Sequence, residues 1–244
     1  MEKEKLRQIL HDQQEIFNHL GEFIEREVSL NLDNYIKGNE IIIITGIRRC
    51  GKSSLLKLIS KKLKERFVYI NFDDVRFTDF KVQNFEDIEE IVFEMQGAKK
   101  GINYLLDEVQ NAPVWERWVN NLYTKNIKVF VTGSNSNLLS SEISTFLTGR
   151  NKVIKLFPFS FKEFLLFKAI NKDYQTTDEK RAVSQSFIEY FEKGGFPLVI
   201  KNDDLELSKQ YFEDILNKDI ISRYKIKKIK ELKDLILYLV SNVG

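Results

Sequence analysis

The sequence predicts an α/β protein whose core is a parallel sheet of five strands, followed by a smaller helical region. Five short runs of almost continuous apolar residues have the length of strands, and they lie at residues 41–45, 67–72, 102–106, 129–132 and 152–157. Helical or polar stretches separate one run from the next. Buried strands that alternate with helices are typical of a parallel sheet with helices on both faces.

Helical patterns flank these strands. Residues 5–27 carry apolar side chains at a helical spacing, which predicts one or two amphipathic helices within an N-terminal segment, residues 1–30. The strands and their helices then occupy residues 31–158. After Pro158 the strand pattern stops, and helical patterns predict a small helical subdomain over residues 159–222.

Length and composition limit the class of protein. The chain has 244 residues, of which 43% are hydrophobic and 30% charged, as in an ordinary globular protein. With 38 basic and 36 acidic residues, the net charge of +2 creates no overall field that favours nucleic acid or a membrane. A single cysteine, Cys50, fits a reducing compartment, and no apolar run approaches the roughly 20 residues that span a bilayer. We expect a cytoplasmic protein that does not bind membranes.

Residues 46–53 form the pattern G-x-x-x-x-G-K-S, between the first strand and an apparent helix. Glycines let the backbone turn tightly, so that successive N–H groups and the helix N-terminus point at a chain of phosphates. Lys52 would reach the β- and γ-phosphates, and the Ser53 hydroxyl would ligate Mg²⁺. We expect the nucleotide to be held by Gly46, Ile47, Arg48, Arg49, Cys50, Gly51, Lys52, Ser53 and Ser54.

The sequence leaves the roles of three of these loop residues undecided. Cys50 is either a small residue that fits the loop or a redox-sensitive thiol, whose pKa a helix N-terminus could lower. Arg48 and Arg49 add positive charge beside the phosphates, and they are either exposed or in contact with a partner.

An acidic pair, Asp107 and Glu108, ends the strand at 102–106. In a parallel sheet whose first strand leads into a phosphate loop, an aspartate at this position would face the Mg²⁺ ion. We therefore expect Asp107 and Ser53 as metal ligands. Glu108 would orient and activate the attacking water, as a catalytic residue beside Lys52. The alternative is an acidic surface turn.

Two further positions are candidates for catalysis. The strand at 129–132 ends in polar residues, so that Ser134 or Asn135 could contact the γ-phosphate or the water, unless they cap the following helix. Arg150 precedes the last strand and could stabilise transition-state charge on the nucleotide of a neighbouring subunit, as arginine fingers do. A solvated arginine after a turn is the alternative.

Several segments together resemble a known family, and they follow in the family's order: GIRRCGKSSLL, YINFDD, YLLDEVQ, VFVTGSNSNLL, TGRNKVIKLFPFSFKEFL and GGFP. The chain is similar, over about residues 20 to 240, to the prokaryotic, archaeal-type AAA-family P-loop ATPases that carry a C-terminal domain of unknown function. The resemblance implies a P-loop NTPase (AAA+-like) three-layer core, ATP with Mg²⁺ as cofactors, and hydrolysis. It places the family's second-strand aspartates on Asp73 and Asp74, and its polar strand-end motif on Thr132 to Asn135.

The resemblance also bears on the C-terminal part of the chain. It implies that LFPFSFKEF links the core to a helical lid, and that family members continue past this region into a winged-helix-like domain. We accordingly expect residues 223–244 to begin that domain, in a chain that is a fragment or a shortened member. A protein or DNA partner would then bind in the part that follows.

A basic stretch, residues 218–233, holds seven Lys or Arg residues against two acids. Such a stretch could contact the phosphates of DNA, although a solvated helix face or a subunit contact is the favoured explanation.

Three functions are compatible with these patterns. The first is an ATPase that couples nucleotide state to conformational change with a protein or DNA partner, and that assembles into a homo-oligomer with Arg150 acting in trans. The second is a nucleotide-gated DNA- or protein-binding regulator with little turnover. The third is a small-molecule kinase, for which no acceptor pocket or lid motif is evident.

Overall fold

The computed structural model describes residues 1–21, 23–63, 66–97, 101–134, 147–171, 173 and 175–242. Within these residues, five parallel strands form one sheet in the order β2-β3-β4-β1-β5. The strands are β1 (Ile41–Gly46), β2 (Arg66–Asn71), β3 (Ile102–Asp107), β4 (Val129–Ser134) and β5 (Asn151–Lys155). The predicted parallel five-stranded sheet is confirmed, and each strand lies within two residues of its predicted position.

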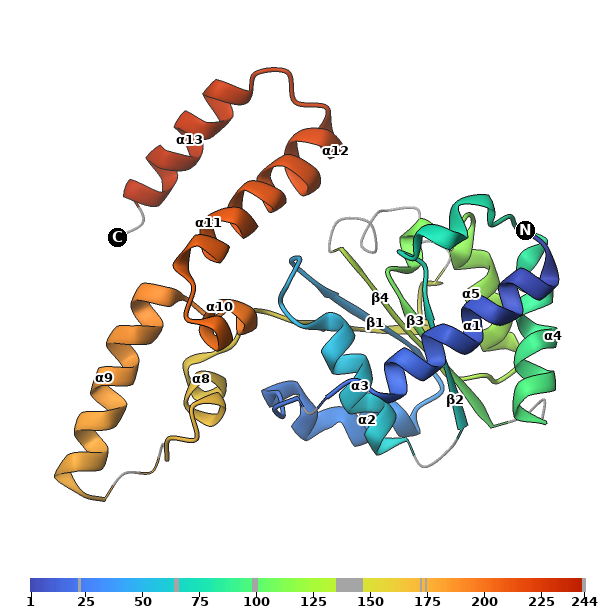
Figure 1. Ribbon diagram of the computed structural model, residues 1–244, viewed down its shortest axis with the longest axis horizontal. Helices are drawn as coiled ribbons and strands as arrows, with labels where there is room; N and C mark the ends of the chain where they lie inside the picture. The colour runs from blue at the N-terminus through green and yellow to red at the C-terminus, as the bar shows by residue number, and fades with distance from the viewer. Residues whose placement is uncertain are drawn as a thin grey trace.

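Helices cover both faces of this sheet (Figure 1). On one face, α4 (Asn84–Gln96), α5 (Trp115–Thr124) and the first turns of α1 (Lys3–Asn18) share a hydrophobic core with alternate strand residues. On the other face, α3 (Lys52–Lys62) and α2 (Leu32–Lys37) pack with the remaining strand residues in a second core. The three-layer α/β arrangement is therefore confirmed.

Helix α1 covers the free edge of β2. Its residue Gln13 donates from Nε2 to the Asn71 carbonyl at 3.0 Å and accepts from the Asn71 N–H at 2.9 Å. Gln14 accepts from the Tyr69 N–H at 2.9 Å. These side chains satisfy backbone groups that an edge strand otherwise exposes to other chains.

Of the one or two helices expected over residues 5–27, the structure has α1, which ends at Asn18. Residues 23–26 are not helical, and the chain next turns in a 3₁₀ helix, η1 (Glu27–Asn31). Phe23 packs against the second core, whereas Ile24 packs against a separate core in the helical region. Each of these two apolar residues thus packs against a different core, and they do not lie on one face of a helix.

The described chain after β5 is helical and forms an arm beside the α/β core (Figure 1). Phe159, Phe164 and Ile200 form its own small hydrophobic core. Its elements are α8 (Phe161–Phe167), α9 (Thr177–Lys193), α10 (Pro197–Asn202), α11 (Leu205–Asp214), a π-helical segment η4 (Ile215–Ile221), α12 (Ser222–Tyr224) and α13 (Ile229–Ser241). In the described part of the chain, no helix combines the length and the apolar character that crossing a membrane requires.

Candidate functional site

A cavity of about 620 Å³ lies where the carboxyl ends of β1 and β3 face the helical arm. This is the edge of an open parallel sheet at which ligands bind, and the volume suits a ligand of nucleotide size. The core supplies Arg48, Arg49, Gly51, Lys52, Ser53, Ser54, Asn71, Asp73, Asp107 and Glu108, and the arm supplies Pro197, Leu198, Lys201, Tyr211, Asp214 and Lys218.

The loop between β1 and α3 depends on two glycines. A Cβ atom on Gly46 would overlap the Leu156 carbonyl oxygen and lie 2.7 Å from the Cys50 sulfur, so no larger residue fits there. Gly51 has a φ of 102°, in the left-handed region that favours glycine, and α3 begins at the next residue. The predicted strand–loop–helix order is therefore present, and the N-terminal residues of α3 line the cavity.

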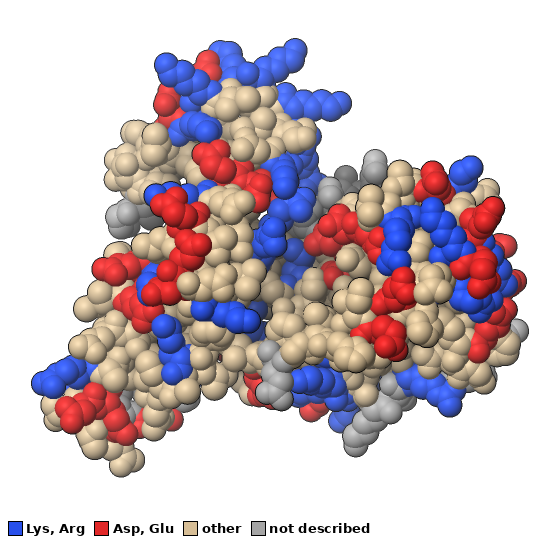
Figure 2. All heavy atoms as spheres, viewed as in Figure 1, with Lys and Arg blue, Asp and Glu red and all other residues tan. Residues whose placement is uncertain are grey.

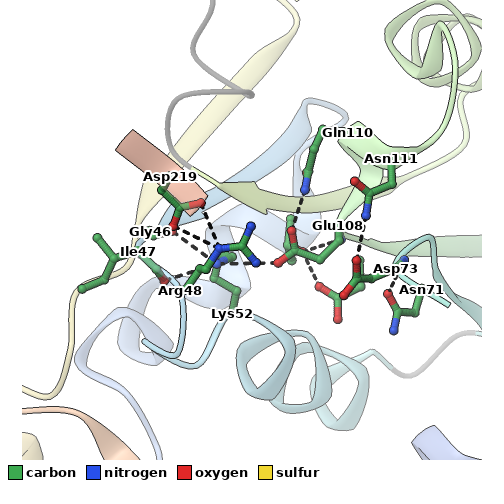
Figure 3. Close-up of polar contacts among 12 residues, drawn as sticks. Gly46, Ile47, Arg48, Lys52, Asn71, Asp73, Glu108, Gln110, Asn111 and Asp219 are labelled. Atoms are coloured by element: carbon green, nitrogen blue, oxygen red, sulfur yellow. Dashed lines mark hydrogen bonds and ion pairs between the residues drawn. The ribbon is translucent and has the colours of Figure 1, made fainter. Parts of the chain in front are cut away.

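The backbone of this loop holds the side chain of Lys52. Its ammonium is buried and donates to the carbonyls of Gly46 at 3.2 Å and Ile47 at 3.3 Å. The same nitrogen lies 3.8 Å from Oε1 of Glu108 (Figure 3). The structure thus brings together Lys52, at the start of α3, and Glu108, after β3, which the sequence predicts as catalytic residues.

Asp107 is fixed by hydroxyl groups from both neighbouring strands. The Tyr69 hydroxyl donates to Oδ2 at 2.9 Å, and the Thr132 hydroxyl donates to Oδ1. Burial, together with the Asp107 charge, raises the pKa of Tyr69 far above its usual value, so the phenol keeps its proton. The Thr132 oxygen also accepts from the Glu108 N–H at 3.1 Å, which links both acids to β4.

Glu108 turns toward the loop because its backbone has a φ of 48°, a left-handed conformation that a non-glycine residue adopts rarely. Gln110 donates to its Oε2 at 2.6 Å, while Oε1 faces Lys52. Sparsely populated backbone conformations of this kind cluster at functional sites. A carboxylate at this position can accept a proton from a water bound beside the loop.

The two aspartates after β2 separate into different environments. Asp73 lines the cavity and accepts from the Asn111 amide at 3.1 Å (Figure 3). Asp74 instead caps η2 (Val75–Asp79) and pairs with Arg76, which holds the pKa of the Asp74 carboxyl well below its usual range. Of these two aspartates, only Asp73 lines the cavity.

Ser53 and Asp107 line the same cavity and carry oxygen atoms of the kind that Mg²⁺ binds. Each Asp107 oxygen accepts one hydroxyl and so keeps capacity for a metal ion. Among the described residues, no group of three or more His, Cys, Asp or Glu side chains could hold a metal by itself. Mg²⁺ bound with nucleotide phosphates needs only one or two protein ligands, because the phosphates and waters supply the others.

Cys50 is fully buried in the second core and does not line the cavity. Burial raises the pKa of its thiol, although the charges of Lys52 and Arg26 act in the opposite direction. The expectation that a helix N-terminus could lower this pKa is therefore wrong, because loss of solvent dominates. Cys50 acts as a small buried residue of the loop.

Both loop arginines contact the helical arm. Arg48 donates from Nε to both carboxylate oxygens of Asp219, at 2.9 and 3.0 Å (Figure 3). Arg49 places its guanidinium 5.4 Å from the centre of the Tyr211 ring. These partners lie far along the chain, and the sequence alone did not indicate them.

The structure does not bring Arg150 into the cavity. Its carbonyl accepts from the Ile41 N–H at 2.8 Å, at the amino ends of β1 and β5, opposite the phosphate loop. Its side chain donates to Asn120 and lies 5.8 Å from the centre of the Tyr123 ring. Asn135, the other catalytic candidate, lies outside the described residues.

A parallel sheet of this order, with a glycine-rich phosphate loop after β1 and an acidic pair after β3, defines a P-loop NTPase of the AAA+-like class. A family model described as an AAA domain matches residues 38–165, slightly more than half of the chain. The chain belongs to this AAA domain family.

Curated relatives extend the similarity beyond that domain. The chain is 36% identical over 220 residues to an uncharacterized protein of Methanocaldococcus jannaschii, covering 87% of this chain and 49% of that protein. It is 35% identical over 233 residues to an uncharacterized protein of Haemophilus influenzae, covering 91% of this chain and 56% of that protein. The chain thus spans about half the length of the curated relatives it matches.

Solved structures show more distant similarity. The replication initiator DnaA bound to AMPPCP and single-stranded DNA matches with a TM-score of 0.47 and 21% identity, covering 86% of this chain and 70% of that chain. The RuvB Holliday junction branch migration motor of Thermotoga maritima matches with a TM-score of 0.45 and 16% identity, covering 92% of this chain and 69% of that chain.

Proposed function

We propose that the protein is a cytoplasmic Mg²⁺-dependent ATPase that couples its nucleotide state to a conformational change. The observation that carries the proposal is the position of Lys52, which contacts the phosphate loop and lies 3.8 Å from Glu108. A phosphate chain in this loop would meet a buried cation, the N-terminus of α3 and an acid suited to activate water.

Each residue has a distinct part in the proposed reaction. Lys52 would exchange its two carbonyl contacts for the β- and γ-phosphates, which carry full negative charge. Ser53 and Asp107 would hold Mg²⁺, which neutralises charge that develops on the phosphates. Glu108 would position a water in line with the γ-phosphate and accept its proton.

The helical arm supports the coupling to conformation. Tyr211, Asp214 and Lys218 line the same cavity as the loop, so a bound nucleotide would contact both parts of the protein. A ligand that contacts two parts favours the arrangement in which both contacts form. Hydrolysis would remove one set of contacts and change that preference.

Mg²⁺-dependent ATP hydrolysis by the purified protein, measured over a series of protein concentrations, tests the proposal. We expect Glu108→Gln to keep ATP binding and to lower turnover by about 10²- to 10⁴-fold, because only activation of the water is removed. The matched control is Glu116→Gln, a half-buried glutamate in the first turn of α5. Normal hydrolysis by Glu108→Gln would refute the catalytic assignment.

The basic region, residues 218–233, supports a second candidate, a nucleotide-gated regulator that binds DNA or protein with little turnover. Figure 2 shows Lys and Arg side chains at the tip of the arm and along its side that faces the core. Ion pairs join Lys218 to Asp214, Lys228 to Glu231 and Lys233 to Glu213. The exposed lysines at 225, 227 and 230 carry further positive charge.

Retention on DNA distinguishes this candidate. A regulator would bind DNA without measurable ATP turnover, and its affinity would fall steeply with salt in proportion to the number of phosphates contacted. Replacing Lys225, Lys227 and Lys230 with Gln would weaken that binding and reduce the salt dependence. DNA affinity that this triple variant leaves unchanged would exclude the basic region as the contact.

A further inference from the structure

Arg26 joins three parts of the protein through one buried side chain. Its Nε donates to Oε1 of Glu163 at 2.9 Å, and its Nη2 donates to Oε2 at 3.1 Å. The guanidinium also donates from Nη1 to the Cys50 carbonyl at 3.0 Å and from Nη2 to the Phe157 carbonyl at 2.7 Å. It therefore links the phosphate loop, the connection that follows β5, and helix α8.

Glu163 holds this guanidinium in one orientation. Its two oxygens also accept from the N–H groups of Glu27 at 2.7 Å and Ser160 at 3.0 Å, so that each oxygen has two donors. Burial opposes ionisation, but Arg26 and these two N–H groups outweigh it and lower the pKa of the Glu163 carboxyl. A bidentate pair with filled acceptors has little freedom to rotate. The Phe159 ring, 4.9 Å from the guanidinium carbon, covers one face.

The position of Arg26 suits support of the loop better than direct contact with phosphate. Its side chain is 6% exposed, and four of its five N–H groups already have acceptors. The bond to Cys50 fixes the peptide that leads into Gly51. Because the C=O and N–H of a trans peptide point in opposite directions, that bond also directs the Gly51 N–H away from Arg26.

We propose that Arg26 is a positioning residue for the phosphate loop, which sets the orientation of the Cys50–Gly51 peptide and ties it to helix α8. The expected effect of Arg26 on ATP binding rests on the proposed function, whereas its effect on the conformation of the loop does not. Since Glu163 lies in α8, a movement of the helical arm would be transmitted through Arg26 to the loop. Arg26 lies before the segment that matches the AAA domain family, residues 38–165.

Arg26→Lys is the variant that tests this role. Lysine keeps the positive charge facing Glu163, but a single ammonium cannot reproduce the planar fork that reaches a carboxylate and two carbonyls. Lys57→Met provides a matched control. The Lys57 ammonium is also buried, donates to the carbonyls of Phe17 at 2.8 Å and Asn18 at 3.1 Å, and lies 4.9 Å from the centre of a phenylalanine ring.

Hydrogen exchange of the nucleotide-free protein reports on the loop itself. We expect Arg26→Lys to raise the exchange rate of residues 46–54 by about tenfold, on the order of one lost charge-assisted hydrogen bond, and Lys57→Met to leave it unchanged. ATP affinity should fall by about the same factor in Arg26→Lys only. Loop exchange equal to that of the unmodified protein, in a folded Arg26→Lys variant, would overturn the proposal.

A second variant covers a failure of Arg26→Lys to fold. In Arg26→Met combined with Glu163→Met, both buried charges are replaced by apolar side chains, a change that proteins often tolerate. The loop should again exchange faster than in Lys57→Met, and slow exchange would count against the proposal. If the unmodified protein bound no ATP at all, the proposed function would fail, while the exchange comparison would still decide the role of Arg26.

Discussion

The Nε–H of Arg48 donates a bifurcated hydrogen bond to both carboxylate oxygens of Asp219, at N–O distances of 2.9 and 3.0 Å, and so joins the phosphate loop to the helical arm. The side chains are 41% and 18% exposed, so the pair is only partly protected from water. Arg48 lines the cavity, where a phosphate would compete with the carboxylate for the same guanidinium. A bound nucleotide could therefore replace Asp219 as the partner of Arg48.

Asp219→Asn should tighten ATP binding. The substitution removes a negative charge that neutralises Arg48, and an ion pair of this exposure is worth at most about 1 kcal/mol, or about fivefold in affinity. Calorimetric titration at low and high salt measures the effect, which should shrink as salt increases. Asp234→Asn, an equal change of charge on exposed helix α13, should leave the affinity unchanged. Weaker binding by Asp219→Asn would contradict the competition.

Lys52→Ala should weaken ATP binding by roughly 10- to 100-fold, because a buried ammonium that faces the phosphates contributes about 1.5–3 kcal/mol. Lys61→Ala, on the exposed face of the same helix, is the control. Fluorescence titration with a labelled nucleotide would compare the two variants. Equal affinity for both would mean that this loop is not the nucleotide site.

Arg150→Ala should leave ATP binding unchanged, because Arg150 lies at the edge of the sheet opposite the phosphate loop. If Arg150 acts on the nucleotide of a neighbouring subunit, turnover per subunit should fall about 10³-fold at high protein concentration, where the protein assembles. Lys155→Ala, an exposed basic residue of β5, the strand that follows Arg150, should retain turnover. An equal loss in a strictly monomeric sample would rule out action in trans.

The free energy of unfolding should increase as the pH rises from 8 to 9.5, because the partly buried Lys128 ammonium loses its proton in this range. Burial lowers the pKa of its ammonium from 10.5 to about 8, although the Glu40 carboxylate acts in the opposite direction. The unfolded chain therefore binds more protons than the folded protein in this range, so the free energy of unfolding increases with pH. The cost of the buried charge is fully present below pH 8 and is relieved above it.

Urea unfolding at pH 7.5, 8.5 and 9.5 measures this effect. The rise should be about 1 kcal/mol, since the ammonium is partly exposed, and it should disappear in Lys128→Met. Lys125→Met, which removes a lysine paired with Glu89 on the surface, should keep it. A rise that persists in Lys128→Met would assign the pH dependence to other groups.

The features that the sequence predicts correctly are those that depend on local patterns. Strands β1 and β3 are buried along their whole length, so their apolar runs are nearly continuous, and Gly46, Gly51 and Lys52 form a motif within eight residues. The helical spacing over residues 5–27 extends past the end of α1 at Asn18, because Phe23 and Ile24 have apolar partners in two different cores and continue that spacing only by coincidence.

The site residues that the sequence does not reveal act through partners distant in the chain. Tyr69 and Asp107 are 38 residues apart, Arg26 and Glu163 are 137 apart, and Arg48 and Asp219 are 171 apart. No local period or spacing distinguishes an arginine with such a partner from a solvated one. Only the strand order and the position of the arm bring these side chains together.

Residues 215–221 are wound as a π-helix, so the direction in which the last helices of the chain point depends on how many residues this segment contains. A π turn holds more residues than an α turn, and each residue of an α-helix advances the chain by about 100°. Deletion of one residue from this segment would let it rewind as an α-helix with nearly the same total turn, whereas deletion of a second residue would rotate Arg223, Tyr224 and α13 around the axis of α11 by about 100°. The face that these helices present is therefore encoded in the number of residues that precede them, as well as in their own composition.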